Sequence, residues 1–122
     1  MPSISVIIST YNKPHFLEKV LTGYSFQTFN DFEIIIADDG SLNETQRMIE
    51  KFKLLIPQKI YHVWHEDNGF RKCKILNAAI VKSSNDYLVF SDGDCIPDSH
   101  FLETHSRSVS YTHLRAHETV LH

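Results

Sequence analysis

The 122-residue sequence has few cysteines, no long apolar run and no excess of basic residues. Its two cysteines, Cys73 and Cys95, are too few for a disulfide framework and lack zinc-ligand spacing, so a reducing compartment is expected. No apolar stretch approaches the ~18 residues of a membrane-spanning helix, and no basic segment precedes residues 4–8 as in a signal peptide. A net charge of -3 disfavours nucleic-acid binding. These absences favour a cytoplasmic globular protein without a transmembrane segment.

Four segments of the sequence have the composition of strands. Nearly continuous β-branched or apolar runs at residues 6–8, 32–37 and 87–90 predict strands that are buried on both faces. Residues 60–64 alternate in polarity and predict a further strand.

Helical patterns separate these strands. Pro14 predicts the start of a first helix, residues 41–44 match a capping box for a second, and residues 71–82 predict a third. The β-α-β order predicts an α/β fold, with a Rossmann-like parallel sheet, flanking helices and right-handed crossovers. The apolar residues expected to face the sheet are Phe16, Leu17, Val20, Leu21 and Tyr24, then Met48, Ile49, Phe52 and Leu55, then Ile75, Leu76, Ala79 and Ile80.

Polar residues follow each predicted strand. Taken singly, such residues are more often turn formers than site residues. In a parallel sheet, however, the carboxyl ends of the strands meet at one edge, where ligands bind. Four polar groups at one edge therefore predict a site. They are Thr10-Tyr11-Asn12, Asp38-Asp39-Gly40-Ser41, residues 66–71 and Asp92-Gly93-Asp94.

Asp92 and Asp94 stand one residue apart, directly after the last predicted strand. Two carboxylates this close form a hard-oxygen site that suits Mg²⁺ or Mn²⁺. A divalent ion there would bridge the phosphates of a nucleoside diphosphate and neutralise charge as that group leaves. An isolated pair of this kind is usually a solvated turn, so the metal prediction depends on the other polar groups.

The sequence contains four motifs in a fixed order and spacing. They are I-S-V-I-I-S-T-Y-N (Ile4 to Asn12), I-I-I-A-D-D-G-S (Ile34 to Ser41), D-N-G-F-R-K-C-K-I-L-N (Asp67 to Asn77) and F-S-D-G-D-C-I-P (Phe90 to Pro97). In order and in spacing they resemble those of family-2 glycosyltransferases of the GT-A fold. The resemblance implies that residues 1–106 are the N-terminal, nucleotide-sugar-binding half of a GT-A domain. The N-G-F-R and D-G-D-C-I-P details are similar to bacterial members that build surface polysaccharides.

The resemblance also implies roles for single residues. Asp39 would accept a hydrogen bond from the base, most often from uracil N3–H. Asp94 would coordinate Mn²⁺ or Mg²⁺ directly, and Asp92 would contact the ribose and the metal shell. Arg71 would approach the diphosphate or the sugar. The other expected donor-binding residues are Thr10 and Asn12 beside the nucleoside, Tyr11 next to them, and Asn68 and Asn77 on the sugar side.

The function implied is inverting, metal-dependent transfer of a sugar from a UDP-sugar to a hydroxyl group of a saccharide or lipid-linked saccharide. The reaction would serve bacterial surface polysaccharide synthesis, in the cytoplasm or at the inner face of the cell membrane. In the family, the catalytic base and acceptor site come from a second half that this sequence does not include, so no catalytic residue is assigned, and neither Asp98 nor Glu103 is taken as the base.

Two other functions stay open. One is a non-catalytic sugar-nucleotide-binding module. The other is a sugar nucleotidyltransferase of related fold, which would usually need a glycine-rich phosphate-binding loop after the first strand. Residues 9–14 contain no glycine, so the sequence disfavours that second alternative.

Residues 107–122 do not resemble the continuation of the family. Residues 109–119 resemble the translation of a transposase-end adapter used in shotgun sequencing, so 107–122 are expected to be a non-native tail. His113 and His117 have the spacing of a helical metal pair, but no Glu follows His113 as in H-E-x-x-H, and no metal site is predicted there. The remaining histidines are expected in turns, in strands and at the surface: His15, His62, His65, His100 and His105.

Overall fold

The structure is a computed structural model that describes residues 2–112, with side chains described as far as Ser108. Strands and helices alternate throughout this part of the chain, as the sequence predicts. The elements are β1 (Ile4–Thr10), α1 (Pro14–Ser25), β2 (Phe32–Asp38), α2 (Asn43–Leu55), β3 (Ile60–Trp64), α3 (Lys72–Lys82), β4 (Tyr87–Asp92) and α4 (Phe101–Thr112).

The strands form one parallel sheet in the order β3-β2-β1-β4. This arrangement confirms the predicted α/β fold. Thr10 of β1 pairs with Asp38 of β2, and Ser9 pairs with Asp92 of β4. The carboxyl ends of β1, β2 and β4 therefore lie level, and the residues that follow them emerge at one edge of the sheet.

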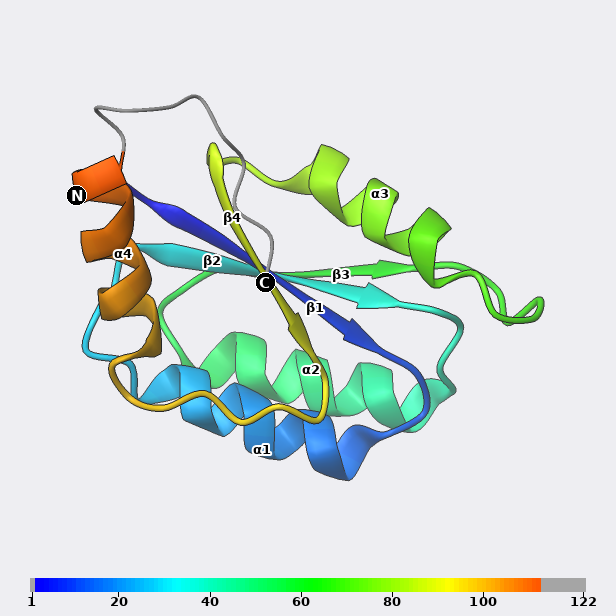
Figure 1. Cartoon of the computed structure of the whole chain (residues 1–122). Helices are drawn as coiled ribbons and strands as arrows, with labels where there is room; N and C mark the ends of the chain where they lie inside the picture. Colours follow the sequence, from blue (N-terminus) through cyan, green and yellow to red (C-terminus); the bar gives the residue numbers. More distant parts are fainter. Residues whose placement is uncertain (1, 113–122) are drawn as a thin grey trace.

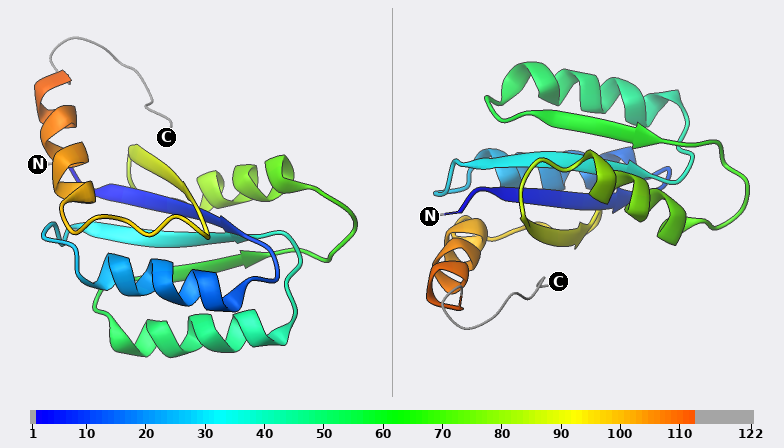
Figure 2. Two further views of the ribbon diagram at one scale, coloured as in Figure 1. Left: turned by 60° about the horizontal axis from the view of Figure 1, so that its bottom comes forward. Right: turned by 90° about the horizontal axis from the view of Figure 1, so that it is seen from above.

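The helices form layers on both faces of this sheet. Helices α1 and α2 lie side by side on one face, α3 covers the other, and α4 lies near the amino end of β1 (Figures 1 and 2). Within residues 2–112, no helix is long and apolar enough to cross a membrane.

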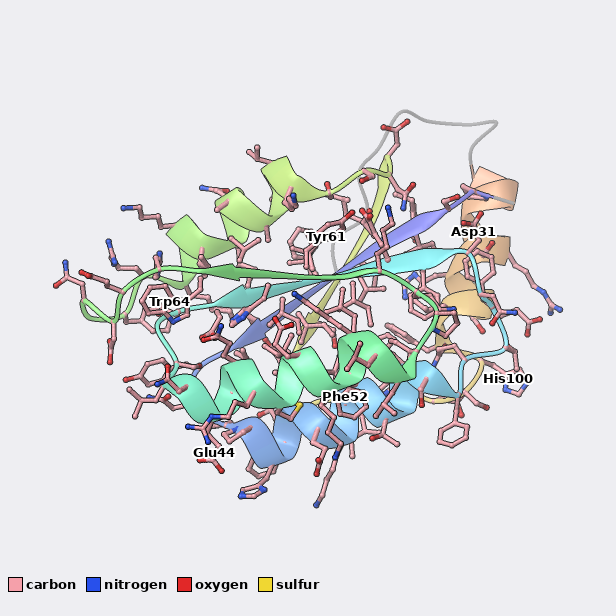
Figure 3. All side chains as sticks on the ribbon, turned by 180° about the vertical axis from the view of Figure 1, so that it is seen from behind. Asp31, Glu44, Phe52, Tyr61, Trp64 and His100 are labelled. Atoms are coloured by element: carbon pink, nitrogen blue, oxygen red, sulfur yellow. The ribbon has the colours of Figure 1, made fainter. Side chains whose placement is uncertain are left out.

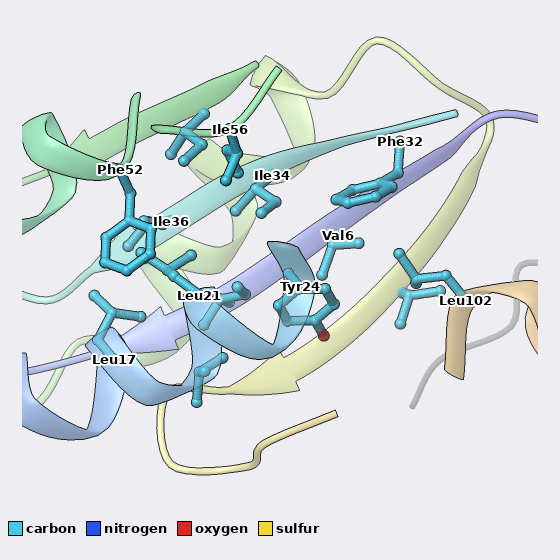
Figure 4. Close-up of a cluster of buried hydrophobic side chains, with 14 of the residues drawn as sticks. Val6, Leu17, Leu21, Tyr24, Phe32, Ile34, Ile36, Phe52, Ile56 and Leu102 are labelled. Atoms are coloured by element: carbon cyan, nitrogen blue, oxygen red, sulfur yellow. The ribbon is translucent and has the colours of Figure 1, made fainter. Parts of the chain in front are cut away.

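The side chains of β1 and β2 alternate between two apolar cores, as expected for strands buried on both faces. Val6 and Ile34 belong to the larger core, against α1 and α2 (Figure 4). Ile7 and Ile35 point the other way and pack with Ile75 of α3. The two central strands, whose carboxyl ends border the candidate site, are thus fixed from both sides.

The helix starts agree with the sequence only in part. Pro14 is the first residue of α1, as predicted. The predicted capping box at residues 41–44 is wrong: Leu42 precedes α2 and no side chain caps the helix. Ser41 is otherwise engaged, because its Oγ accepts a hydrogen bond from the backbone N–H of Asn12 at 2.7 Å.

Three apolar residues predicted to face the sheet are exposed instead. They are Phe16, Leu55 and Ile80, with exposed fractions of 51%, 62% and 38%. Each lies within the first or last three residues of its helix. Fewer strand side chains are within reach at these ends, so the apolar stripe of the sequence is longer than the buried face.

Helix α4 crosses the predicted boundary between residues 106 and 107 and ends at Thr112. That 107–122 are a non-native tail stays a prediction. Residues 113–122, with His113 and His117, lie outside the described residues.

Candidate functional site

A cavity of about 490 Å³ lies at the carboxyl edge of the sheet. Thr10, Asp39 and Asp92 all line it, which confirms that the ends of β1, β2 and β4 converge on one site. The wall is completed by residues of these strand ends, of the β3–α3 loop and of α3: Ser9, Tyr11, Lys13, Ala37, Asp67, Gly69, Phe70, Lys72, Ile75, Gly93 and Asp94.

The carboxylate of Asp39 is held in place from two sides. Asp39 is only 7% exposed. Nε2 of His65 lies 2.5 Å from Asp39 Oδ1, and the backbone N–H of Arg71 donates to Oδ2 at 3.0 Å. Burial favours the neutral carboxyl, but the hydrogen bonds from His65 and Arg71 and the charges of these residues lower the pKa of Asp39 below its ordinary 3.8. Asp39 is therefore a fixed, ionised acceptor in the cavity wall.

Its neighbour Asp38 lies away from the cavity and supports the turn after β2. Asp38 is fully buried and does not line the cavity. Its Oδ2 lies 2.8 Å from His62 Nε2, and its Oδ1 accepts the backbone N–H of Ser41 at 2.9 Å. Trp64, at the carboxyl end of β3 (Figure 3), donates its indole N–H to the Ser41 carbonyl at 3.0 Å. Asp38 thus holds the turn that presents Asp39.

The loop after β1 is joined to the same turn. Asn12 adopts a left-handed φ of 48°. Its N–H donates to Ser41 Oγ, and its Oδ1 accepts the N–H of Leu42 at 2.8 Å. Asn12 does not line the cavity, so the structure gives it a bracing position. Thr10 does line the cavity, and its buried Oγ1 has no hydrogen-bond partner among the described residues.

The β3–α3 loop is fastened to this edge at two points. The hydroxyl of Tyr11 donates to Asp67 Oδ2 at 2.6 Å, and this hydrogen bond raises the pKa of Tyr11. Gly40 has a φ of 98°, and a Cβ there would come within 2.5 Å of the Asp67 backbone. Only glycine allows the turn after β2 to approach the loop this closely.

Besides Asn12, three residues with predicted donor-binding roles lie outside the cavity wall. Arg71 precedes α3, where its Nη2 donates to the Glu66 carbonyl at 2.9 Å and its buried Nε has no partner among the described residues. Asn68 and Asn77 are exposed, in the loop and in α3. None of the three is among the residues that line the cavity. Their contacts with a donor stay predictions.

The carboxylates of Asp92 and Asp94 form the open side of the site. Asp92 Oδ1 accepts hydrogen bonds from Lys72 Nζ at 3.1 Å and from Ser9 Oγ at 3.0 Å. These contacts, with the Lys72 charge, outweigh burial and lower the pKa of Asp92 below 3.8. One ligand atom each from Asp92, Asp94 and Cys95 lies within 4.8 Å of the others.

The donor set suits a hard divalent cation through its two carboxylates. Cys95 offers a soft sulfur, which is a poor ligand for such an ion, and burial and the neighbouring Asp94 raise the pKa of its thiol. We therefore count Asp92 and Asp94, and not Cys95, as the residues that fit Mg²⁺ or Mn²⁺.

Sequence reasoning alone did not single out His62, His65 or Lys72. The general assignment of the histidines to turns, strands and surface did not foresee the contact of His65, whose side chain is only 16% exposed and contacts Asp39. These contacts follow from the parallel register, which places Trp64 beside Asp38 and so brings the histidines near the end of β3 to the two aspartates at the end of β2. Neither this register nor the position of the Lys72 side chain has a local signal in the sequence.

The chain is similar to known glycosyltransferases over most of its length. The model of Glycosyl transferase family 2 matches residues 5–109. Glycosyltransferase AglE of Haloferax volcanii is 30% identical over 114 residues, which are 92% of this chain and 37% of AglE.

Solved structures show the same fold. Staphylococcus aureus TarS in complex with UDP-GlcNAc superimposes with a TM-score of 0.77 at 24% identity, over 91% of this chain and 32% of that one. The mannosyltransferase PcManGT from Pyrobaculum calidifontis, in complex with GDP-Man and Mn²⁺, superimposes with a TM-score of 0.76 at 22% identity. The match covers 91% of this chain and 32% of that one. The chain thus spans about a third of these relatives. Because the family model matches most of its length, the chain belongs to glycosyl transferase family 2.

Proposed function

We propose that this chain is the donor-binding half of an inverting, metal-dependent glycosyltransferase that takes its sugar from a UDP-sugar. The observation that carries the proposal is one cavity in which the fixed Asp39 carboxylate and the Asp92/Asp94 pair are brought together. The similar proteins TarS and PcManGT bind UDP-GlcNAc and GDP-Man respectively, which supports a nucleotide-sugar donor.

The base would be read by Asp39. Uracil N3–H is a single donor, and an ionised carboxylate acceptor at the cavity wall matches it. The unpartnered hydroxyl of Thr10 would take a further polar group of the nucleoside. This pairing favours UDP over GDP as the leaving nucleotide.

The diphosphate would lie toward Asp92 and Asp94, which would hold Mn²⁺ or Mg²⁺. The bound ion would supply charge stabilisation for the departing diphosphate, so the leaving group need not be protonated. The complex of PcManGT with Mn²⁺ supports divalent-metal use. Lys13 and Lys72 also line the cavity and add positive charge to it, and Lys72 contacts Asp92.

The acceptor would be a hydroxyl group of a saccharide or lipid-linked saccharide in bacterial surface polysaccharide synthesis. The reaction would take place in the cytoplasm, or with the enzyme peripheral to the inner face of the cell membrane. The resemblance of the N-G-F-R and D-G-D-C-I-P motifs to such bacterial enzymes supports this role.

Calorimetric titration of the chain tests the donor assignment. With Mn²⁺ present, UDP-glucose and UDP-GlcNAc are expected to bind more tightly than GDP-mannose, and free glucose is the matched control without a nucleotide. Equal or tighter binding of GDP-mannose would contradict the uracil assignment, and no binding of any nucleotide sugar would contradict the proposed function.

A further inference from the structure

Lys72 brings a positive charge into the cavity from a fixed position. It is the first residue of α3, and its Nζ lies 3.1 Å from Asp92 Oδ1. The preceding residue, Arg71, is anchored through its backbone N–H to Asp39 and through its side chain to the Glu66 carbonyl. The start of α3 is therefore held against the site, while the Lys72 side chain itself is 41% exposed and free to change rotamer.

The partner of Lys72 is one of the two carboxylates that fit a divalent cation. An ammonium group on Asp92 neutralises part of the charge that would attract such an ion, and two cations at one carboxylate repel each other. The long side chain of lysine can move between acceptors, because it carries a compact charge on four methylene groups. The phosphates of a nucleoside diphosphate would offer it such an acceptor in the same cavity.

We propose that Lys72 is an internal counter-ion of the donor site, an inference that rests on the proposed function. It neutralises Asp92 while the site is empty, and it transfers its hydrogen bond from Asp92 to the diphosphate when the donor and a divalent ion bind. The amino terminus of the 11-residue helix α3 adds a positive partial charge at the same place, which favours this acceptor. Lys72 would then oppose binding of the metal alone and support binding of the metal with nucleotide.

The proposal predicts effects of opposite sign from one substitution. Lys72→Met keeps most of the side-chain stem and removes the charge. Its affinity for Mn²⁺ alone, measured by electron paramagnetic resonance of free Mn²⁺, is expected to rise roughly three- to tenfold, the range of a partly exposed charged hydrogen bond. Its affinity for UDP at saturating Mn²⁺, measured by calorimetry, is expected to fall by a similar factor.

Two further variants separate charge from structure. Lys74 lies on the same helix but is exposed and outside the cavity wall. The Lys74→Met variant should therefore keep its affinities for Mn²⁺ alone and for UDP with Mn²⁺ unchanged. Lys72→Arg keeps the charge and should retain most of the UDP affinity. Circular dichroism of each variant checks the fold, and Lys72→Gln repeats the test if the methionine variant does not fold.

The outcomes distinguish this inference from the proposed function. If the unmodified chain binds UDP with Mn²⁺ but Lys72→Met changes neither affinity, or changes both in the same direction, Lys72 is not a counter-ion. An arginine variant that binds UDP as weakly as the methionine variant does would also overturn the role of charge. If the unmodified chain binds neither Mn²⁺ nor UDP, the proposed function fails, and this inference fails with it.

Discussion

Two acidic pairs stand at the carboxyl edge of the same sheet, and their surroundings differ. Asp38 and Asp39, at the carboxyl end of β2, are buried, and each carboxylate is bound by one histidine and one backbone N–H. Asp92 and Asp94, at the carboxyl end of β4, are exposed, and the side-chain contacts of Asp92 come from Lys72 and Ser9.

The difference separates recognition from charge compensation. A carboxylate whose position is set by the fold can select a hydrogen-bond donor of defined geometry, because little ordering is needed when the ligand binds. Exposed carboxylates keep free lone pairs for a cation that arrives with the substrate. We infer that the β2 end of the site is formed in advance, and that the β4 end is completed by its ligands.

The largest effect is expected from Asp94→Ala. The side chain is exposed, and its described contact is a weak one from the Cys95 thiol at 3.6 Å, so the fold should not change. In a glycosyltransferase that contains this donor-binding half, as proposed above, turnover should fall on the order of a hundredfold or more, because charge stabilisation of the diphosphate is lost.

Asp86→Ala is the matched control for this variant, since Asp86 is exposed and directly precedes the amino end of the same strand. Metal-dependent turnover that survives in Asp94→Ala, measured as transfer of labelled sugar, would remove Asp94 from the metal site.

Asp39→Ala should weaken UDP binding by roughly ten- to a hundredfold, the cost of losing a hydrogen bond to a charged group. Calorimetry of the chain with UDP and Mn²⁺ measures this change. Because Asp39 also binds His65 and the Arg71 N–H, the variant should be less stable as well, so its fold is checked by circular dichroism. Unchanged UDP affinity in a folded variant would show that Asp39 does not read the base.

Asp38→Ala sharpens the distinction within the β2 pair. It leaves the Ser41 N–H and His62 without their buried acceptor, which should lower the free energy of unfolding by about 1–3 kcal/mol. Urea denaturation measures this loss, with Asp86→Ala as the exposed control that should change stability by less than about 0.5 kcal/mol. A variant as stable as the control would mean that Asp38 does not hold the turn.

The smallest effect concerns acid stability. The fold lowers the pKa of Asp39, so this carboxylate stabilises the folded state above its ordinary pKa of 3.8, and the contribution is lost as the pH falls through the lower folded value. The free energy of unfolding of the Asp39→Asn variant, measured by urea denaturation, should therefore depend less steeply on pH between about pH 3 and pH 5 than that of the unmodified chain. Equal slopes would show that Asp39 is not ionised preferentially in the folded state.

Periodicity predicted the fold well because strands and helices here carry strong, local patterns. The runs at β1 and β2 are apolar on both faces, and each lies in the centre of the sheet with a helical layer on either side. Helix ends were predicted less well. The capping signal at Ser41 failed because a distant residue, Asn12, took up its side chain.

The site was predictable at the strand ends and unpredictable in its cross-connections. Asp39, Asp92 and Thr10 follow strands, so topology alone brings them together. The contacts of His65 with Asp39 and of Lys72 with Asp92 join residues 26 and 20 positions apart on different elements. Such pairs depend on the register of neighbouring strands and on where α3 begins, which no local pattern specifies.

The central claim is that the β2 end of the site is preformed and the β4 end needs a metal. Calorimetric titration of the chain with uridine and with UDP, each with and without Mn²⁺, tests it most directly. We predict that uridine binds equally well in both conditions, because it reaches only the Asp39 end, whereas Mn²⁺ strengthens UDP binding at least about tenfold. Uridine binding that requires Mn²⁺, or UDP binding that Mn²⁺ does not change, would contradict the account.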